Sequence, residues 1–493
     1  MKEKIVLIGA GSAIFTQGLV RDLAVRAKPA VLALVDVDPQ ALETADRLAG
    51  KIVDALSAPI TVEASLDRRD VLAGATTVIT TIAVGGRRAW EADVFVPRRF
   101  GVYQPVGDTA MPGGTSRALR MIPVMLDIAR DMLDLAPEAL FVNYANPMTA
   151  ICQAVRKHTG VRVVGLCNGV ADRQRTIARL LGKKPSGLSF SYVGINHLTW
   201  LREVRDNGAS EKPRLKEIAA TRLALLRRGT PIGQHFEEAG TAGQAEALEL
   251  SDIMPATWAM FELFDAIPLP FDRHIVEFFP WLFCGPAQYY GATLGVDAYS
   301  FENTIRQGDI IYAEMQENAF SPHPLPKQYL ERHIGEHENL VEVLNAIEDD
   351  SGLLISANLP NDGLIPDLPA RSYLEAPALV DARGVRHAEV EPLPPALLGT
   401  LSTRLQWVET VIEAAVEGSR TKFAQALILD GAVRRVEAAR HMADELLAAQ
   451  MEHLPQFAGT IREGYVAHAA STESQEGGGQ NVRSAPVEGN PLR

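Results

Sequence analysis

A series of short apolar runs in the first two hundred residues restricts the fold of this 493-residue chain more than any other feature. Each run is followed by a helical pattern, and each ends in glycine or in a polar residue. We interpret as strands the runs at residues 5–8, 31–35, 78–83, 140–142 and 161–166. Strands that alternate with helices indicate repeated βαβ units and a parallel sheet. We therefore predict an α/β fold with a Rossmann-like, doubly wound parallel sheet.

The first run ends in a glycine-rich turn. Gly9 and Gly11, followed by Ser12, provide the tight turn and the close backbone approach that a pyrophosphate needs at a helix N-terminus. Ile14 stands where the usual fingerprint has a third glycine, so the motif alone is weak. Asp36 ends the second run, where a carboxylate can bind a ribose and would repel a 2′-phosphate. The pattern favours NAD over NADP, and the competing interpretation of Asp36 is a solvated turn residue.

Two further polar groups follow β-prone runs. Cys167 comes after the run at 161–166, and His197 follows another run and a glycine. A thiolate and an imidazole suit a first-row divalent metal, with substrate oxygens completing its shell. Unpaired cysteines are often simply buried in the core, and histidines at strand ends are often simply hydrogen-bonded. Spacing alone leaves both interpretations open.

Titratable groups are embedded in the aromatic run FDRHIVEFF, which follows a proline-rich turn. The run contains four of them, Asp272, Arg273, His274 and Glu277. Such groups are costly to bury unless they are paired, so the run predicts either an ion-pair network or a site. The glycine-rich loop at 106–114 suits a segment close to a ligand, and Asp108 is its only acid. At this level, a metal-assisted dehydrogenase of a secondary alcohol fits equally well.

Composition limits the remaining possibilities. A formal net charge of −13 argues against nucleic-acid or acidic-membrane partners bound through bulk charge. Three scattered cysteines form no disulfide framework, and the first apolar run is short for a signal peptide. The sequence has no run of about 18 apolar residues, so we expect no membrane span. We expect a soluble, cytoplasmic protein of two lobes. Residues 471–493 are poor in large apolar residues and predict a disordered tail.

Taken together, these stretches resemble glycoside hydrolase family 4, the NAD- and metal-dependent glycosidases. The matching pieces are IGAGS (8–12), VGG (84–86), YQPVGDTAMPGG (103–114), NYANPM (143–148), GLCNG (165–169), GINHLTW (194–200), DRHIVEFFP (272–280), NDGLIPDLP (361–369) and LVDARGV (379–385). The resemblance implies a lactate/malate dehydrogenase-like architecture. Residues 1–195 would form the NAD-binding domain and residues 196–465 a mixed α+β domain for substrate, metal and oligomerisation. It also implies a homodimer or a homotetramer.

The resemblance assigns roles to single residues. Cys167 and His197 match the metal-ligand positions, where the metal is Mn²⁺ or another divalent ion. Asn146 matches an asparagine that lies between the substrate and the nicotinamide, and Asp108 matches the residue proposed to protonate the leaving group. We expect the substrate to contact Asn146, together with Asn168 and Arg273.

The base and the substrate class depart from the best-known pattern of the family. Its 6-phosphoglycosidases use a tyrosine base in the segment that corresponds to about 268–276, and this chain has no tyrosine there. We expect His274 to be the base, with Asp272 as the second choice. The loop at 103–114, with its Gly-Asp-Thr sequence, and the stretch DRHIVEFFP at 272–280 look more like the members that act on unphosphorylated α-galactosides and α-galacturonides. The alternatives are a 6-phospho-α-glycosidase, a metal-dependent NAD dehydrogenase of a free sugar, and a sugar-sensing binding protein without catalysis.

The reaction implied by the resemblance is an oxidation followed by an elimination. NAD⁺ would take a hydride from C3 of the sugar, and a base would remove the acidified C2 proton while the metal stabilises the enediolate. β-Elimination would expel the aglycone as Asp108 protonates it. Water would then add, and NADH would return the hydride, so that NAD acts as a cofactor and not as a substrate.

Overall fold

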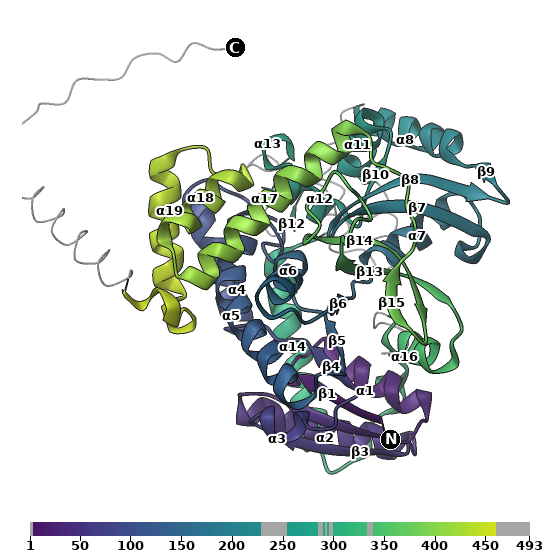
Figure 1. Ribbon diagram of the computed structural model, residues 1–493, viewed down its shortest axis with the longest axis vertical. Helices are drawn as coiled ribbons and strands as arrows, with labels where there is room; N and C mark the ends of the chain where they lie inside the picture. Colours follow the sequence, from purple (N-terminus) through teal and green to yellow (C-terminus); the bar gives the residue numbers. More distant parts are fainter. Residues whose placement is uncertain are drawn as a thin grey trace, which may run out of the picture.

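The computed structural model describes most of the chain, and its centre is one 13-stranded sheet covered by helices. The described residues are 3–227, 254–283, 289–290, 293–294, 299–332 and 339–459. Figure 1 shows the N-terminal strands in the lower part of the view and the antiparallel strands at the upper right. The segment predicted to be a disordered tail, residues 471–493, lies outside the described residues, as does Cys284.

Six parallel strands form one half of the sheet, in the order β3-β2-β1-β4-β5-β6. They are β1 (Glu3–Ile8), β2 (Ala30–Val35), β3 (Ile60–Ser65), β4 (Thr77–Thr80), β5 (Leu140–Asn143) and β6 (Val163–Gly165). This order is that of a Rossmann-type sheet, so the predicted fold class is confirmed. The edge strand β3 was not among the predicted strands, because its sequence ITVEAS has no fully buried position and no apolar run.

Side chains along the parallel strands point alternately to two layers of helices. On β1, Val6 and Ile8 belong to one core, whereas Ile5 and Leu7 belong to the other. The first core lies against α5 (Met111–Leu135), α6 (Met148–Thr159), α17 (Pro395–Glu417), α18 (Arg420–Asp430) and α19 (Val436–Ala449). The second lies against α1 (Phe15–Arg26), α2 (Pro39–Ala55), α14 (Phe301–Phe320) and α16 (Leu340–Asp349). Burial on both faces explains why these strands are continuous apolar runs.

Antiparallel strands from later in the chain extend the same sheet beyond β6. In spatial order they are β13 (Leu353–Pro360), β14 (Tyr373–Asp381), β7 (Leu188–Ile195), β8 (Leu198–Asp206) and β10 (Ile267–Leu269), with β15 (Gly384–His387) paired to β14 and β9 (Ala209–Ser210) paired to β8. The junction is formed where Asn358 of β13 pairs with Gly165 of β6. The second, mixed α+β part is thus joined to the first through a continuous sheet. The predicted division at 195/196 falls in the tight turn between β7 and β8.

Shorter elements complete the described part of the chain. They are α3 (Arg69–Leu72), α4 (Gly86–Arg99), α7 (Gly169–Leu180), η1 (Pro185–Gly187), α8 (Lys212–Arg227), α11 (Pro255–Phe264), α12 (Asp272–Phe278), α13 (Pro280–Phe283), β11 (Tyr289–Tyr290), β12 (Thr293–Leu294), α15 (Lys327–Arg332), η3 (Met451–His453) and η4 (Pro455–Phe457). Within the described ranges, no helix has both the length and the apolar character needed to cross a membrane.

Candidate active site

The carboxyl ends of the parallel strands carry the polar residues that the sequence places there. At the end of β1, the backbone N–H groups of Gly9 and Ala10 both donate to the carbonyl oxygen of Val35, at 2.8 and 3.0 Å. Asp36, which follows β2, accepts the Gly11 N–H at 2.7 Å through Oδ2. The structure therefore brings the predicted turn residues and Asp36 into direct contact.

A side chain at either glycine of this turn would approach neighbouring atoms to less than 3 Å, backbone atoms at Gly9 and side-chain atoms at Gly11. Gly9 has a φ of +93°, and a Cβ at this position would lie 2.8 Å from the backbone nitrogen of Ile82. A Cβ at Gly11 would lie 2.9 Å from Asp36 Oδ2. Helix α1 begins just beyond, with no acidic side chain in its first turn, and Ser12 Oγ accepts the Phe15 N–H at 3.2 Å. The positive end of α1 thus carries no counter-charge of its own.

A second group of polar side chains is assembled from segments far apart in the chain. Asp108 precedes α5, His197 lies in the β7–β8 turn, and His274 lies on α12. Their potential ligand atoms all lie within 4.8 Å of one another. Cys167 follows β6, and its Sγ lies 3.5 Å from His197 Nε2. The ring centroids of His197 and His274 are 4.0 Å apart.

Hydrogen bonds within the cluster fix the orientation of His197. The Thr109 hydroxyl donates to Asp108 Oδ1 at 2.7 Å and lies 3.0 Å from His197 Nδ1. Because the hydroxyl proton is used on Asp108, the hydroxyl oxygen can only accept from Nδ1–H. The neutral imidazole then presents its unprotonated Nε2 towards Cys167, which is the arrangement that a metal ligand needs. Asn146 Nδ2 donates to Asp108 Oδ2 at 3.0 Å on the other side.

Burial keeps both histidines of the cluster neutral. It lowers the pKa of His197, an effect that the charge of Asp108 opposes. It lowers the pKa of His274 further, well below its usual value, and the neighbouring charges of His197 and Arg273 add to this effect. His274 Nδ1 is buried and has no hydrogen-bond partner among the described residues. Burial thus favours the neutral form of both imidazoles, which is the form that binds a metal.

Asp272 lies only two residues from His274 but does not join the cluster. Its carboxylate, 1% exposed, accepts the backbone N–H groups of Ala256 and Thr257 at 2.7 and 3.0 Å, as well as the Thr257 hydroxyl. These contacts satisfy amides at the first turn of α11 and stabilise its negative charge there. The structure thus ties the Asp272 carboxylate to the start of α11.

Arg273 and Asn168 flank the cluster. The Arg273 guanidinium lies 5.3 Å from the centroid of Phe271 and 4.6 Å from that of Tyr299, within the range of cation–π contacts. Asn168 directly follows Cys167 at the start of α7, and its side chain makes no capping hydrogen bond. Their roles as substrate contacts stay predictions.

The loop that carries Asp108 is held at both ends by buried carboxyl groups to which our sequence analysis assigned no role. Glu277 Oε1 accepts the N–H groups of Val106 and Gly107 at 2.8 and 2.7 Å. Asp430 Oδ2 accepts the Met111 N–H at 2.7 Å. Burial raises the pKa of Glu277 well above its usual value and that of Asp430 to about 6. A sequence signal existed for Glu277, one helical turn after His274, whereas nothing in the sequence connects Asp430 with this loop.

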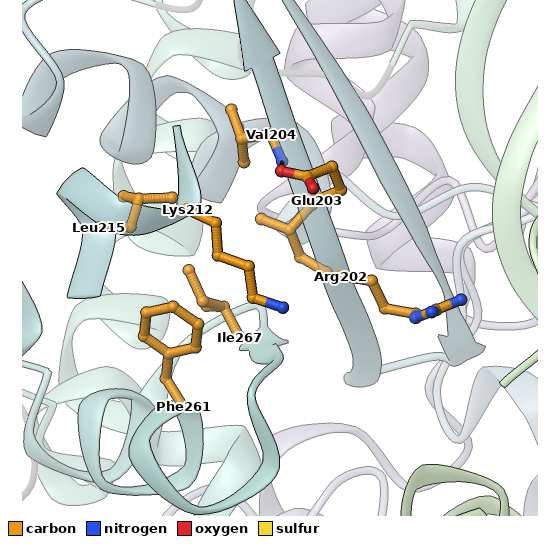
Figure 2. A pocket seen from close by; sticks show the side chains of 8 residues that line it. Arg202, Glu203, Val204, Lys212, Leu215, Phe261 and Ile267 are labelled. Atoms are coloured by element: carbon orange, nitrogen blue, oxygen red, sulfur yellow. Dashed lines mark hydrogen bonds between the residues drawn. The ribbon is translucent and has the colours of Figure 1, made fainter. Parts of the chain in front are cut away.

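A small hollow elsewhere in the described structure shares no residue with the cluster. Figure 2 shows its lining, with the Lys212 side chain extending across it. Its volume is about 170 Å³. The lining residues are Leu201, Arg202, Glu203, Val204, Lys212, Leu215, Phe261 and Ile267. Because Lys212 Nζ is already paired with Asp265 at 2.7 Å, the hollow offers no unsatisfied cation.

The Rossmann-like sheet and the Cys/His/Asp cluster at its edge together indicate an enzyme. Comparison with known proteins identifies its family. Residues 4–183 match the family 4 glycosyl hydrolase model, and residues 192–433 match the model of the C-terminal domain of the same family. The chain belongs to family 4 of the glycosyl hydrolases and is a glycoside hydrolase.

Individual relatives agree with this assignment. An α-glucosidase of Erwinia rhapontici is 31% identical over 92% of this chain and 99% of that protein. An α-galactosidase of Rhizobium meliloti (strain 1021) is 31% identical over 93% of this chain and 90% of that protein. Among solved structures, a 6-phospho-α-glucosidase from gut microorganisms in complex with NAD and Mn²⁺ superposes with a TM-score of 0.74 at 18% identity, covering 92% of this chain and 99% of the other. This last likeness shows the fold.

Proposed function

We propose that this glycosidase hydrolyses unphosphorylated α-glycosides, of the α-galactoside or α-galacturonide type, with NAD and Mn²⁺ as cofactors. The observation that carries the proposal is the convergence of Asp108, His197 and His274 within 4.8 Å, with Cys167 beside His197. We further propose that the enzyme works in the cytoplasm as a homodimer or homotetramer. A fold relative that binds NAD and Mn²⁺ supports the choice of cofactors.

The glycine turn fits the pyrophosphate and ribose of NAD. Neighbouring atoms leave no room for a side chain at Gly9 or Gly11, and the first turn of α1 carries no acidic residue. Asp36 uses one lone pair of each carboxylate oxygen on backbone N–H groups, those of Gly11 and Asp38, and keeps lone pairs for ribose hydroxyls. When bound, NAD⁺ supplies a reversible hydride acceptor for C3 of the sugar, which acidifies the C2 proton.

The donor set of the cluster fits Mn²⁺ or another first-row divalent ion. Cys167 Sγ and His197 Nε2 would hold the ion, because Thr109 turns the lone pair of Nε2 towards the sulfur. The metal, when bound, supplies Lewis-acid stabilisation of negative charge on the sugar oxygens.

The remaining groups of the cluster move protons. His274 would accept the C2 proton, since its imidazole is buried, neutral and without a hydrogen-bond partner at Nδ1 among the described residues. Asp108 would give a proton to the departing glycosidic oxygen, oriented by Thr109 on one carboxylate oxygen and by Asn146 on the other. The two groups lie close enough to act on adjacent carbons of one sugar.

Two observations support an unphosphorylated substrate. The segment 268–276 contains no tyrosine, unlike the 6-phosphoglycosidases that the chain resembles. The two 31% identical relatives are named α-glucosidase and α-galactosidase, without a phosphate in either name.

The test is turnover of nitrophenyl α-galactoside, α-galacturonide and 6-phospho-α-glucoside with NAD⁺ and Mn²⁺ in D₂O. We expect hydrolysis of one of the first two, deuterium at C2 of the product sugar, and a flat absorbance at 340 nm when the matching methyl glycoside, whose aglycone does not absorb there, is turned over. Rising absorbance would identify a dehydrogenase that releases NADH. Hydrolysis without NAD and without deuterium at C2 would refute the mechanism, and a preference for the phosphorylated sugar would refute the substrate class.

A further inference from the structure

Glu277 is a completely buried carboxyl group that connects two parts of the cluster. It lies on α12 one helical turn after His274, and its exposed fraction is 0%. Its Oε1 accepts two consecutive backbone N–H groups, those of Val106 and Gly107. Its Oε2 is buried and has no hydrogen-bond partner among the described residues. Within the described residues, the hydrogen bonds of Glu277 therefore all go to the loop that carries Asp108.

The two contacts fix the backbone immediately before Asp108. Two successive N–H groups that converge on one oxygen define the orientation of both peptide planes, as in an anion-binding nest. The Asp108 side chain starts from the next residue, so its position follows from the position of these planes. A shift of about 1 Å in such a group can lower a rate by about a hundredfold.

The same side chain belongs to the helix that carries His274. His274 and Glu277 are three residues apart on α12, so a contact made by one restrains the other. Asp430 also holds the loop, through Met111, but it lies on α18, which carries none of the cluster residues. Glu277 therefore links the Asp108 loop to the element of His274 through two side-chain hydrogen bonds.

We propose that Glu277 is a positioning residue that sets the proton-donating carboxyl of Asp108 relative to His274. The proposal rests on the roles proposed above for these two residues. A carboxyl that merely stabilised the fold would affect all substrates equally. A carboxyl that positions Asp108 should matter most where the leaving group needs a proton.

The test compares Glu277→Gln and Glu277→Leu in the full chain with NAD⁺ and Mn²⁺. Glutamine keeps an acceptor oxygen for both N–H groups, whereas leucine leaves them without one. Leu344→Ala is the control for lost stability, because it creates a cavity in the second core, to which α16 belongs and which contains none of the cluster residues. The substrates are a methyl α-glycoside, which needs protonation, and the matching nitrophenyl glycoside, which does not.

We expect Glu277→Gln to keep kcat within about threefold on both substrates. Glu277→Leu should lower kcat by about a hundredfold on the methyl glycoside and by less than about tenfold on the nitrophenyl glycoside, with little change in KM. Equal losses on both substrates in Glu277→Leu, like those of the Leu344→Ala control, would overturn the inference. So would a glutamine variant as impaired as the leucine variant.

Hydrogen exchange of the Val106 and Gly107 amides tests the contact independently of activity. We expect faster exchange in Glu277→Leu and unchanged exchange in Glu277→Gln and Leu344→Ala. Unchanged exchange in Glu277→Leu would overturn the inference whatever the kinetics. If the wild-type enzyme hydrolyses no glycoside, the proposed function fails, and with it the positioning role, even where exchange confirms the contact.

Discussion

The glycine turn and the cluster around His197 lie at the same edge of the sheet but are built in different ways. The turn is made by backbone hydrogen bonds between the ends of two neighbouring strands, with Asp36 and Ser12 as side-chain acceptors. The cluster is made almost entirely of side chains, which come from segments between Asp108 and His274. A backbone-built site tolerates loss of a side chain better than a side-chain-built one. We therefore expect larger effects of substitution in the cluster.

The largest effect should come from the two expected metal ligands. Cys167→Ser or His197→Ala should abolish activity, by at least about a thousandfold, and weaken Mn²⁺ binding while NAD still binds. Calorimetric titration of each variant with Mn²⁺ and with NAD⁺ measures this separation. Cys152→Ser is the matched control, because that thiol is buried among core residues and burial raises its pKa to about 12. Loss of NAD binding together with Mn²⁺ binding would show that the two regions are not separate.

The next effect concerns the base and tests whether His274, inside the cluster, or Asp272, outside it, takes the C2 proton. His274→Ala should lose deuterium exchange at C2 and slow turnover by about a hundredfold or more. Asp272→Ala should keep the exchange and instead lower the free energy of unfolding by about 1–3 kcal/mol, because two buried amides at the start of α11 lose their acceptor. The opposite result, exchange lost only in Asp272→Ala, would make Asp272 the base.

A smaller effect is expected in the glycine turn. Asp36→Ala should weaken NAD binding by about tenfold and improve NADP binding, since the carboxylate that would repel a 2′-phosphate is gone. Fluorescence titration with both reduced cofactors measures the ratio of their affinities. An unchanged ratio would place Asp36 outside the ribose site and leave it the structural bonds to Gly11 and Asp38.

A further effect is on stability alone and comes from a buried carboxyl group behind the cluster. Glu375 is buried, accepts the Thr199 hydroxyl at 2.6 Å and the Asn358 amide at 3.1 Å, and has its pKa raised by burial to about 7. The folded state therefore keeps a proton that the unfolded chain releases near 4.5. Stability should fall as pH rises from there to about 7, by up to about 1.4 kcal/mol per pH unit. Urea unfolding at several pH values should show a flatter slope in Glu375→Gln.

The same contrast explains what could be predicted from the sequence. The glycine turn follows from a local pattern, and the structure places Gly9, Gly11, Ser12 and Asp36 as that pattern requires. The parallel strands were found because burial on both faces makes them apolar runs.

The cluster was harder to predict, because its members are distant in sequence and each has a more ordinary explanation. Residue types alone left Cys167 and His197 open, and only the family resemblance paired them. The sequence ranks His274 before Asp272 as the base without excluding either, since side-chain direction on a short helix depends on what packs against it. Asp430 carried no signal at all, because its partner Met111 is 319 residues away.

The continuous sheet has a consequence for how the protein is made. When β6 leaves the ribosome, its neighbour β13 is still 193 residues from being synthesised at the Asn358–Gly165 junction. During that interval the nascent chain exposes an unpaired strand border, which is a template for association with other chains. The two parts of the protein should therefore not fold well separately. In a chain that ends at residue 195, the free edge of β6 would stay unpaired permanently. Fusion or truncation at this point should give insoluble material even though the sequence suggests a complete domain.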